Sequence, residues 1–554
     1  MLTSRIHLQR LTLVAVSAAA LLASMATMAA VPTRAAPVAS SDQPTAADAR
    51  TSGESTSGSC PTPDPATPKR QFRAMWIASV ANVDWPSRQG LSIAEQQAEY
   101  LRLLDEAEAR RLNGVVVQIR PTADAFWPSP YEPWSEWLTG TPGQDPGYDP
   151  LAFLVREAHA RNLEFHAWFN PYRVRMQTDP EHLAPDHPAR QHPDWIVPYG
   201  GKLYYNPGIP QVRRFVEDAI LHAVKNYDID AVHFDDYFYP YPVGTEQFED
   251  EATYQEYGAG FPDKADWRRH NIDLLVKELS ARLTNAKPWV KFGISPFAVW
   301  RNIATDPEGS DTQAGVETYD DLYADTRRWV REEWIDYIVP QVYWNIGFAP
   351  ADYAKLVPWW SAEVDGRDVQ LVVGQATYKA GTSTQDPAWS DPAEMTRHLT
   401  FNRDHPQVSG DIYFSAKDVI ADRLDNMSIL VADHYTRPAL VPVMSHLGGR
   451  APDRPSLGNA EHTDEGVRLN WTDTSSGDRR ATSYAVYRFD GDDVDPCGFD
   501  DAGNLLTTVR ARPGAKQGFV DTTADPGQVY TYAVTGLDRL YHESVPSKGR
   551  TARP

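Results

Sequence analysis

Between Phe72 and Tyr435 the sequence alternates short apolar runs with longer amphipathic stretches. The apolar runs are typical of strands that are buried on both faces of a parallel sheet. They predict strands at Phe72–Val80, Gly114–Arg120, Glu164–Asn170, Ala231–Asp235, Lys291–Pro296, Tyr337–Tyr343, Gln370–Gln375 and Asp411–Ser415, with helices among them at Ile93–Arg111, Pro150–Arg161, Pro210–Asn226, Trp267–Asn285, Tyr319–Glu333 and Pro392–Asp404. Eight strand–helix units over roughly 360 residues predict an α/β fold, a closed (β/α)8 TIM barrel. A doubly wound open sheet is the competing fold, but no Gly-rich phosphate turn follows any of the strands.

After Pro442 the pattern changes to short alternating runs separated by Gly, Asp and Pro. They predict strands at Gly466–Trp471, Ser483–Phe489, Leu505–Val509, Gly518–Val520 and Val529–Leu537. This pattern indicates a barrel domain over 71–440 followed by a small all-β sandwich over 450–554. The runs Val467–Trp471, Ala481–Arg488 and Val529–Gly536 resemble strands of a fibronectin type III domain. The role of this domain stays open between glycan binding, partner binding and simple spacing. We prefer spacing.

The first 36 residues have the layout of a secretory signal peptide. Arg5 and Arg10 precede an apolar run from Leu11 to Ala23, which is shorter than the ~20 residues that a membrane-spanning helix needs. Residues 37–70 consist mainly of Ala, Ser, Thr, Pro and Asp and predict a disordered spacer. We therefore expect a secreted protein, extracellular or associated with the cell wall, with no integral membrane segment after signal removal.

The formal charge is −22 and becomes −25 when residues 1–36, with three arginines and no acid, are removed. Such an acidic surface repels nucleic acid, so no nucleic-acid partner is expected. The two cysteines, Cys60 and Cys497, fit either one disulfide in an exported protein or two unpaired thiols. Two distant cysteines do not form a zinc-ligand cluster, and neither a metal nor a cofactor is expected.

In a (β/α)8 barrel the catalytic groups lie at the C-terminal ends of the strands. Every predicted strand end except the last offers an aromatic ring, an amide or a carboxyl group. This composition suits a sugar, because its apolar face stacks on aromatic rings while its hydroxyls take hydrogen bonds. The candidate substrate-binding residues are Asp84, Trp85, Arg120, Asp124, Trp168, Asn170, Arg173, Tyr237, Trp300, Arg301, Gln341, Tyr343, Trp344 and Tyr378.

The sharpest feature is Asp235–Asp236, which follows the apolar run of the fourth predicted strand. Two adjacent carboxylates raise the pKa of one of them, so that one acid keeps its proton near neutral pH. Glycosidic cleavage uses such a division between a protonated acid and a carboxylate, and we predict both residues to be catalytic. The structural alternative is a helix cap or an ion pair with Arg120 or Arg173.

Two mechanisms stay open. In one, the acetamido oxygen of an N-acetylated substrate attacks the anomeric carbon, while one Asp polarises the acetamido group and the other protonates the leaving oxygen. In the other, Asp235 or Asp236 works with Asp124 or Asp84 from another strand. His233 points the same way as Asp235 and is expected at the floor of the cleft, whereas His166 is expected in the core.

Six motifs in order resemble the glycosyl hydrolase-like 10 family: Phe72–Ala78, Asn82–Pro86, Gln118–Pro121, Trp168–Arg173, His233–Pro240 and Pro340–Trp344. The resemblance covers roughly Arg70 to Tyr435. It implies a (β/α)8 barrel in an exported or envelope protein, acting on peptidoglycan glycan strands and in particular on strands without peptides. By position it implies that Asp235 and Asp236 are the acidic pair of the family, and that its cleft residues correspond to Arg120, Asn170, Arg173, Gln341 and Tyr343.

The sequence thus predicts a secreted glycoside hydrolase that cleaves an N-acetylhexosamine-containing glycan, with a polysaccharide of the cell wall as its partner. Two other functions stay open. One is a non-catalytic glycan-binding protein of the cell envelope, and the other is a hydrolase of a different extracellular polysaccharide.

Overall fold

The computed structural model describes residue 60 and residues 64–553. The chain divides into two units, Met1–Pro61 and Thr62–Pro554. The predicted signal peptide over 1–36, and the predicted spacer apart from residues 60 and 64–70, lie outside the described residues. Neither Cys60 nor Cys497 is a free thiol, and their pairing with each other stays a prediction. Within the described residues, no helix has the length and apolar character needed to cross a membrane.

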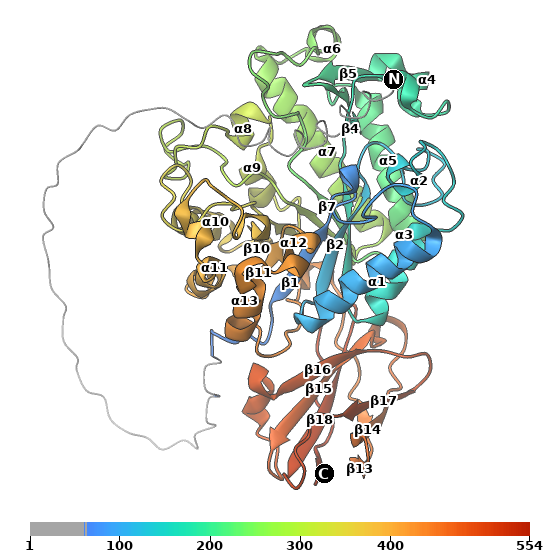
Figure 1. Ribbon diagram of the computed structural model, residues 1–554, viewed down its shortest axis with the longest axis vertical. Coiled ribbons are helices and arrows are strands. Elements are labelled where there is room, and N and C mark those ends of the chain that lie inside the picture. The colour runs from blue at the N-terminus through green and yellow to red at the C-terminus, as the bar shows by residue number, and fades with distance from the viewer. Residues whose placement is uncertain (1–59, 61–63, 554) are drawn as a thin grey trace, which may run out of the picture. The chain divides into compact units, whose positions relative to one another are not determined.

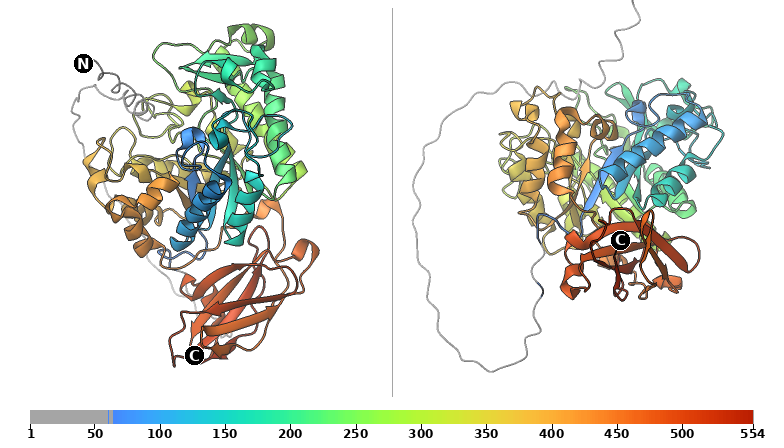
Figure 2. Two further views of the ribbon diagram at one scale, coloured as in Figure 1. Left: turned by 45° about the vertical axis from the view of Figure 1, so that its right-hand side comes forward. Right: turned by 60° about the horizontal axis from the view of Figure 1, so that its bottom comes forward.

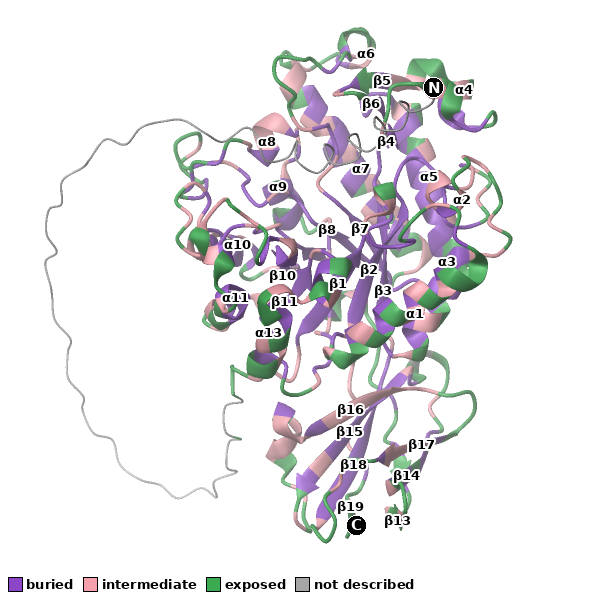
Figure 3. Cartoon of the chain, in the orientation of Figure 1, coloured by how far each residue is buried: buried purple, intermediate pink, exposed green. Residues whose placement is uncertain are grey.

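Eight parallel strands close a barrel in the order β1-β11-β10-β9-β8-β7-β3-β2 (Figure 1). Their bounds are β1 Phe72–Ile77, β2 Gly114–Arg120, β3 Glu164–Phe169, β7 Ala231–Phe234, β8 Lys291–Ile294, β9 Tyr337–Ile338, β10 Gln370–Gln375 and β11 Val408–Tyr413. Each of the eight overlaps a predicted strand, although β9 is shorter than predicted and β11 begins and ends earlier, so the predicted (β/α)8 barrel is confirmed. The strands are wholly or almost wholly buried, as the purple ribbon at the centre of Figure 3 shows. This burial explains why they appear in the sequence as continuous apolar runs.

Helices surround the barrel strands in each view of Figures 1 and 2. Their sequences define their starts: Ser92 and Glu95 form a capping box at the first residues of α1, and a proline opens both α3 and α5. The helices of the barrel domain are α1 Ile93–Ala109, α2 Glu136–Thr139, α3 Pro150–Ala160, α4 Pro188–Gln191, α5 Pro210–Asn226, α6 Glu251–Tyr257, α7 Lys264–Ala286, α8 Thr318–Asp321, α9 Thr326–Arg331, α10 Tyr353–Val364, α11 Glu394–Asn402, α12 Ala416–Ala421 and α13 Asn426–His434.

One predicted helix differs from the structure, and six helices were not predicted: α2, α4, α6, α10, α12 and α13. The helix predicted over Tyr319–Glu333 is two short helices, α8 and α9, because Tyr323 has a left-handed backbone with φ of 52° and Asp325 caps the second one. Helix α10 was not predicted, and it carries Pro358 inside its span. A proline at that place removes a backbone donor and conceals an otherwise helical pattern.

Alternate residues along the strands belong to two different cores. Met75, Val115 and Val117 pack outwards in the cluster that includes the helices, while Trp76 and Val116 belong to a second cluster along the barrel axis. This alternation has the period of two that a strand imposes. It places Trp76, Trp168 and His233 on the inside of the barrel.

A three-stranded antiparallel sheet interrupts the chain between β3 and α5, and it was not predicted. It consists of β4 Arg173–Arg175, β6 Lys202–Tyr205 and β5 Ile196–Tyr199, in that order. Arg173 is paired with Tyr204, and Tyr199 with Lys202. Directly paired residues, and residues two apart in one strand, point to the same face. Arg173, Tyr204 and Lys202 therefore share one face of this small sheet.

The C-terminal module is a sandwich of two antiparallel sheets. One sheet holds β12 Ser456–Leu457, β13 Glu461–Thr463, β14 Gly466–Thr472 and β17 Lys516–Asp521; the other holds β15 Ser483–Asp490, β16 Leu505–Arg510, β18 Tyr530–Leu537 and β19 Arg550–Ala552. The five predicted strands are present, and the short β12, β13 and β19 were missed. The likeness to a fibronectin type III domain stays a prediction.

The central strand β18 in one sheet of the module is buried on both faces. All eight residues of β18 are buried. Tyr532 and Val534 pack against the other sheet, while Ala533 and Leu537 belong to the cluster that runs along the barrel axis. Arg539 adds polar contacts to the start of β7, with its Nη2 at 2.6 Å from the Asp228 carboxylate and 3.2 Å from that of Asp230. The barrel interior and the module therefore share one hydrophobic cluster.

Candidate active site

Asp235 follows the last residue of β7 and is 3% exposed. The Asn170 amide Nδ2 lies 3.1 Å from both of its carboxylate oxygens, and the backbone N–H of Tyr237 donates to Oδ1 at 3.3 Å. Burial, opposed by the Arg173 guanidinium and reinforced by the neighbouring Asp236, raises the pKa of Asp235 to about 6. Asp235 is therefore a fixed carboxylate that titrates close to neutral pH.

Asp236 is half-buried and is held by different groups. The Tyr241 hydroxyl donates a short hydrogen bond to its Oδ2. Burial raises the pKa of Asp236, and the hydroxyl of Tyr241 and the side chain of Gln341 oppose this rise. Because the two carboxylates interact, their protons come off in two steps that belong to the pair. The predicted division between a protonated and an ionised acid therefore has a physical basis.

The Asp pair is supported by residues from β3 and β4. Asn170 Oδ1 accepts the backbone N–H of Arg173 at 2.8 Å, which fixes the amide so that its Nδ2 faces Asp235. The Arg173 guanidinium donates to the carbonyl oxygen of Pro121 and lies 5.1 Å from the centre of the Tyr237 ring. Arg120 is fully buried, donates to the carbonyl oxygens of Asn170 and Pro171, and forms an ion pair with Glu132. Arg120 thus holds the loop that carries Asn170, instead of facing a substrate.

Aromatic rings continue from the Asp pair across the ends of the last barrel strands. Tyr343 and Tyr378 have ring centres 5.8 Å apart, and each lies 6.1 Å from the ring of Phe414. Tyr343 lies close enough to Asp236 for that carboxylate to raise its pKa, although burial is the larger cause. Phe414 corrects the expectation that the eighth strand end offers no aromatic ring. It stands inside the predicted strand Asp411–Ser415, and alternation from Ile412 would have placed it on the inside of the barrel.

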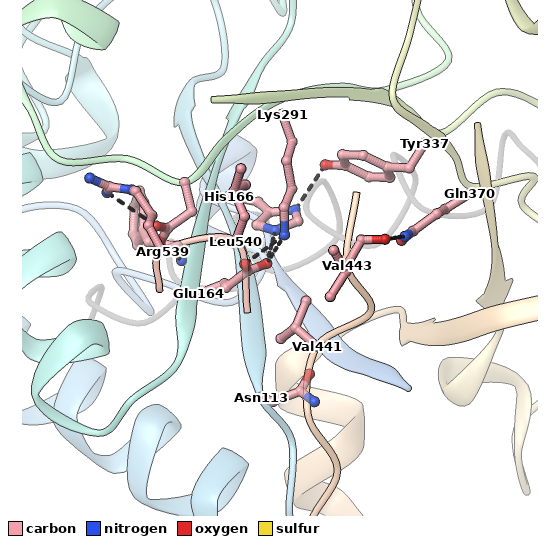
Figure 4. A network of polar contacts seen from close by, with 12 residues as sticks. Asn113, Glu164, His166, Lys291, Tyr337, Gln370, Val441, Val443, Arg539 and Leu540 are labelled. Atoms are coloured by element: carbon pink, nitrogen blue, oxygen red, sulfur yellow. Dashed lines mark hydrogen bonds and ion pairs between the residues drawn. The ribbon is translucent and has the colours of Figure 1, made fainter. Parts of the chain in front are cut away.

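Below the Asp pair, a chain of polar side chains runs through the barrel axis. His233 Nε2 accepts from the Trp76 indole at 3.3 Å and lies 3.0 Å from Ser295 Oγ, while its Nδ1 lies 3.0 Å from the Tyr337 hydroxyl. The same hydroxyl lies 2.8 Å from His166 Nδ1. His166 Nε2 lies 3.0 Å from Glu164, which also accepts from the Lys291 ammonium at 2.6 and 2.8 Å (Figure 4).

The direction of the hydrogen bonds in this chain follows from the indole, which can only donate. His233 Nε2 must accept, and burial holds the pKa of His233 well below its usual range, so the ring is neutral and carries its proton on Nδ1. Nδ1 then donates to the Tyr337 oxygen, and the Tyr337 proton goes to His166. His233 therefore supports the floor of the site as a neutral residue.

The structure separates several predicted substrate-binding residues from the Asp pair. Trp85 has no exposed surface and donates its indole N–H to Gln96 in the outer core, and Trp344 packs on Phe297. Trp300 and Arg301 bind the carboxylates of the α8–α9 region: the indole donates to Asp325 and the guanidinium to Asp320. Trp85, Trp300 and Arg301 thus direct their polar groups to these partners and not to the Asp pair. Trp344 is linked to the pair through Phe297, whose ring centre lies 6.3 Å from that of Tyr241.

Two predicted carboxylates serve the loops around them. Asp84 accepts the Ala78 backbone N–H at 2.8 Å and the Ser415 hydroxyl at 2.7 Å, and so links the ends of β1 and β11; burial raises its pKa to about 6. Asp124 accepts the backbone N–H and the hydroxyl of Thr122. The carboxylate that acts on the pKa of Asp235 is Asp236, so the geometry favours the adjacent pair as the acidic centre. Trp168 lies in the axial core with 7% exposed surface.

The site therefore gathers Asp235, Asp236, Tyr237, Asn170, Arg173, Gln341, Tyr343 and Tyr378 of the predicted residues. Sequence reasoning missed Tyr241, Tyr204, Lys202 and Phe414. Within residues 60 and 64–553, no group of three or more His, Cys, Asp or Glu side chains is placed to hold a metal ion. The expectation that no metal or cofactor takes part stays a prediction.

Two interacting carboxylates of raised pKa at the mouth of a (β/α)8 barrel, beside aromatic rings and amides, are the features of a barrel glycoside hydrolase. The glycosyl hydrolase-like 10 family model matches residues 71–391. The chain is 52% identical over 486 residues to glycosyl hydrolase YngK of Bacillus subtilis, covering 87% of this chain and 93% of the relative. It is 40% identical over 363 residues to glycosyl hydrolase DigH of Escherichia coli, covering 62% of this chain and 82% of the relative.

The chain belongs to the glycosyl hydrolase-like 10 family, and it is a glycoside hydrolase. Among solved structures it is similar to the PgaB (BpsB) glycoside hydrolase domain from Bordetella bronchiseptica, with a TM-score of 0.42 and 12% identity. That match covers 66% of this chain and 99% of the other.

Proposed function

We propose that this glycoside hydrolase cleaves a glycan of N-acetylated amino sugars, the glycan strands of peptidoglycan, with the help of the acetamido group of the substrate. The single observation that carries the proposal is the adjacent pair Asp235–Asp236, whose members are held by different partners at the end of one strand. The six motifs shared with the family support the choice of substrate.

The two carboxylates take different roles because their exposure differs. Asp235 is buried, and Asn170 and the Tyr237 backbone fix it, so it suits the ionised group that accepts the acetamido N–H and stabilises the charge developing there. Asp236 is half-buried and suits the acid that reaches the glycosidic oxygen.

In the first step the acetamido oxygen attacks the anomeric carbon while the bond to the glycosidic oxygen breaks. The proton of Asp236 goes to that leaving oxygen, and the acetamido group becomes a cyclic oxazolinium ion whose N–H faces ionised Asp235. In the second step Asp236, now ionised, takes a proton from water as the water oxygen attacks the anomeric carbon. The ring opens, the acetamido group is restored, and the configuration at the anomeric carbon is retained.

The first test is digestion of purified peptidoglycan, with and without prior amidase treatment, by the wild type and by Asp235→Asn and Asp236→Asn. We expect the wild type to release sugar fragments with new reducing ends, more from peptide-free strands, and each variant to lose activity by about 10²–10⁴-fold. Release of fragments by both variants at the wild-type rate would contradict the proposal. Binding of glycan by the wild type without release would contradict it as well.

The two roles are separated by the leaving group. An aryl glycoside of N-acetylglucosamine with a strongly acidic phenol needs no proton on its leaving oxygen. Asp236→Asn should therefore keep most of its first-step rate on this substrate, whereas Asp235→Asn should lose it on every substrate. The reverse pattern would exchange the assignments of the two residues. Equal losses in both variants would contradict a division of roles.

The site of action is part of the proposal. The signal-peptide layout of residues 1–36 supports export to the cell wall or the medium. Fractionation of the source bacterium should find the chain outside the cytoplasm and shortened by about 29–36 residues at its N-terminus. A full-length chain in the cytoplasmic fraction would contradict export.

A further inference from the structure

A cation without a partner lies in the small sheet, on the face that carries Arg173. Lys202 lies in β6 on the same face of the small sheet as Tyr204 and Arg173. Within the part of the chain that the structure describes, its ammonium group has neither an ion pair nor a hydrogen bond. The side chain is half-buried, and burial lowers its pKa, with the charge of Arg173 adding to the effect. A half-buried cation next to a second cation is costly unless an anion joins them.

The face that carries Lys202 borders the acidic centre. Arg173 lies over the ring of Tyr237, whose backbone N–H binds Asp235. Asp235 also contributes to the raised pKa of Tyr204, about 12, of which burial is the main cause. Lys202 is the next residue on that face beyond Tyr204. A substrate group that extends from the reacting sugar toward β6 therefore meets a positive charge.

The carboxylates near the β5–β6 hairpin already have hydrogen-bond partners. Glu246 accepts the Gly200 backbone N–H at 3.0 Å in the turn between β5 and β6. Asp235 is held by Asn170 and Asp236 by Tyr241. The ammonium group of Lys202 is thus left for a group that the protein itself does not supply.

We infer that Lys202, backed by Arg173, is a subsite for a carboxylate on the sugar next to the cleaved bond. This inference rests on the proposed function and names the substituent that the subsite binds, which is the lactyl ether carboxylate of N-acetylmuramic acid. Attachment of a peptide converts this carboxylate into a neutral amide and removes the charge that Lys202 binds. The subsite therefore gives a physical reason for a preference for peptide-free strands.

The test compares three substrates: a peptide-free oligosaccharide of alternating N-acetylglucosamine and N-acetylmuramic acid, the same oligosaccharide with its lactyl carboxylates converted to methylamides, and an N-acetylglucosamine oligomer. Lys202→Met should raise KM about tenfold on the first substrate, or 1.4 kcal/mol, with kcat unchanged. It should leave KM unchanged on the two neutral substrates. Lys202→Arg should restore most of the loss, and Lys225→Met, an exposed lysine of α5, should change nothing.

Binding of the same three glycans to Asp236→Asn, with and without Lys202→Met, removes the dependence on turnover. The double variant should lose about tenfold in affinity for the carboxylate form alone. Equal losses on charged and neutral glycans, or no loss, would overturn the subsite while leaving the proposed function intact. If the wild type binds the carboxylate form about tenfold better than the methylamide but cleaves neither, the proposed function fails and the subsite stands. Failure of every glycan to bind overturns both.

Discussion

Replacement of Asp235 by asparagine should make the protein more stable at neutral pH while it abolishes activity. Burial raises the pKa of Asp235 from 3.8 to about 6, so its ionised form is less favourable in the folded chain than in the unfolded one. This rise in pKa corresponds to about 3 kcal/mol, since each pKa unit is worth about 1.4 kcal/mol. Asparagine carries no charge, and its carbonyl oxygen can still accept from the Asn170 amide. The structure therefore predicts a gain of about 1–3 kcal/mol in the free energy of unfolding above pH 6.

The sign of the pH dependence follows from the raised pKa. A group whose pKa is higher in the folded state stabilises the fold as it takes up its proton, so the wild type gains stability from Asp235 as the pH falls from 6 to 3.8. Asp235→Asn has no such titration. Its advantage over the wild type should thus be full above about pH 6 and should disappear near pH 4.

Urea denaturation of the wild type and Asp235→Asn at pH 7.5 and pH 4 measures both quantities. Asp404→Asn, at an exposed position after α11, controls for the change of an acid to an amide. An Asp235→Asn variant that is less stable than the wild type at pH 7.5 would refute the reasoning. So would a gain in stability of the same size at both pH values.

Three further outcomes are expected. Arg120→Leu should lower the free energy of unfolding by about 3–5 kcal/mol, because it leaves Glu132 buried without its partner. The double variant Arg120→Leu/Glu132→Leu should recover most of this loss. Additive losses of the two substitutions in urea denaturation would contradict this. Tyr241→Phe should move the basic limb of the pH–rate profile to higher pH, because the Tyr241 hydroxyl lowers the pKa of Asp236. The control Tyr148→Phe, whose hydroxyl binds Gln96, should leave the limb in place. An unchanged basic limb in Tyr241→Phe would refute this role. His233 should appear in nitrogen NMR spectra as a neutral ring with its proton on Nδ1 down to pH 5, and an imidazolium signal at that pH would contradict the order of the axial chain.

The barrel could be predicted from the sequence because its strands are buried on both faces. A run such as Gly114–Arg120 has no polar residue turned to solvent, so its burial is visible in its composition alone. The small sheet was missed because Lys202–Tyr205 and Ile196–Tyr199 mix a lysine, a proline and three tyrosines without clear alternation. Its pairing is set by contacts with the rest of the mouth, which no local pattern records.

The acidic pair was found because two adjacent carboxylates after an apolar run are unusual in themselves. The surrounding residues were harder to assign, since position after a strand does not say which way a side chain turns. Asp84 and Asn170 both follow strands, yet Asp84 turns to the end of β11 and Asn170 to Asp235. Phe414 could have been found by alternation from Ile412, and Tyr241 lies only seven residues after the end of β7, whereas Lys202 comes from a segment far from any barrel strand in the sequence.

The hydrophobic cluster shared by the barrel interior and the C-terminal module bears on how the described part of the chain melts. Tyr487 and Leu537 of the module pack in the same cluster as Phe72 and Tyr337 of the barrel, so neither part can lose its packing without exposing the other. Calorimetry should accordingly record one heat-absorption peak, where a tethered accessory domain would add a second. A chain shortened at Pro442 is expected to leave the end of the barrel interior that holds Phe72 and Tyr337 uncovered.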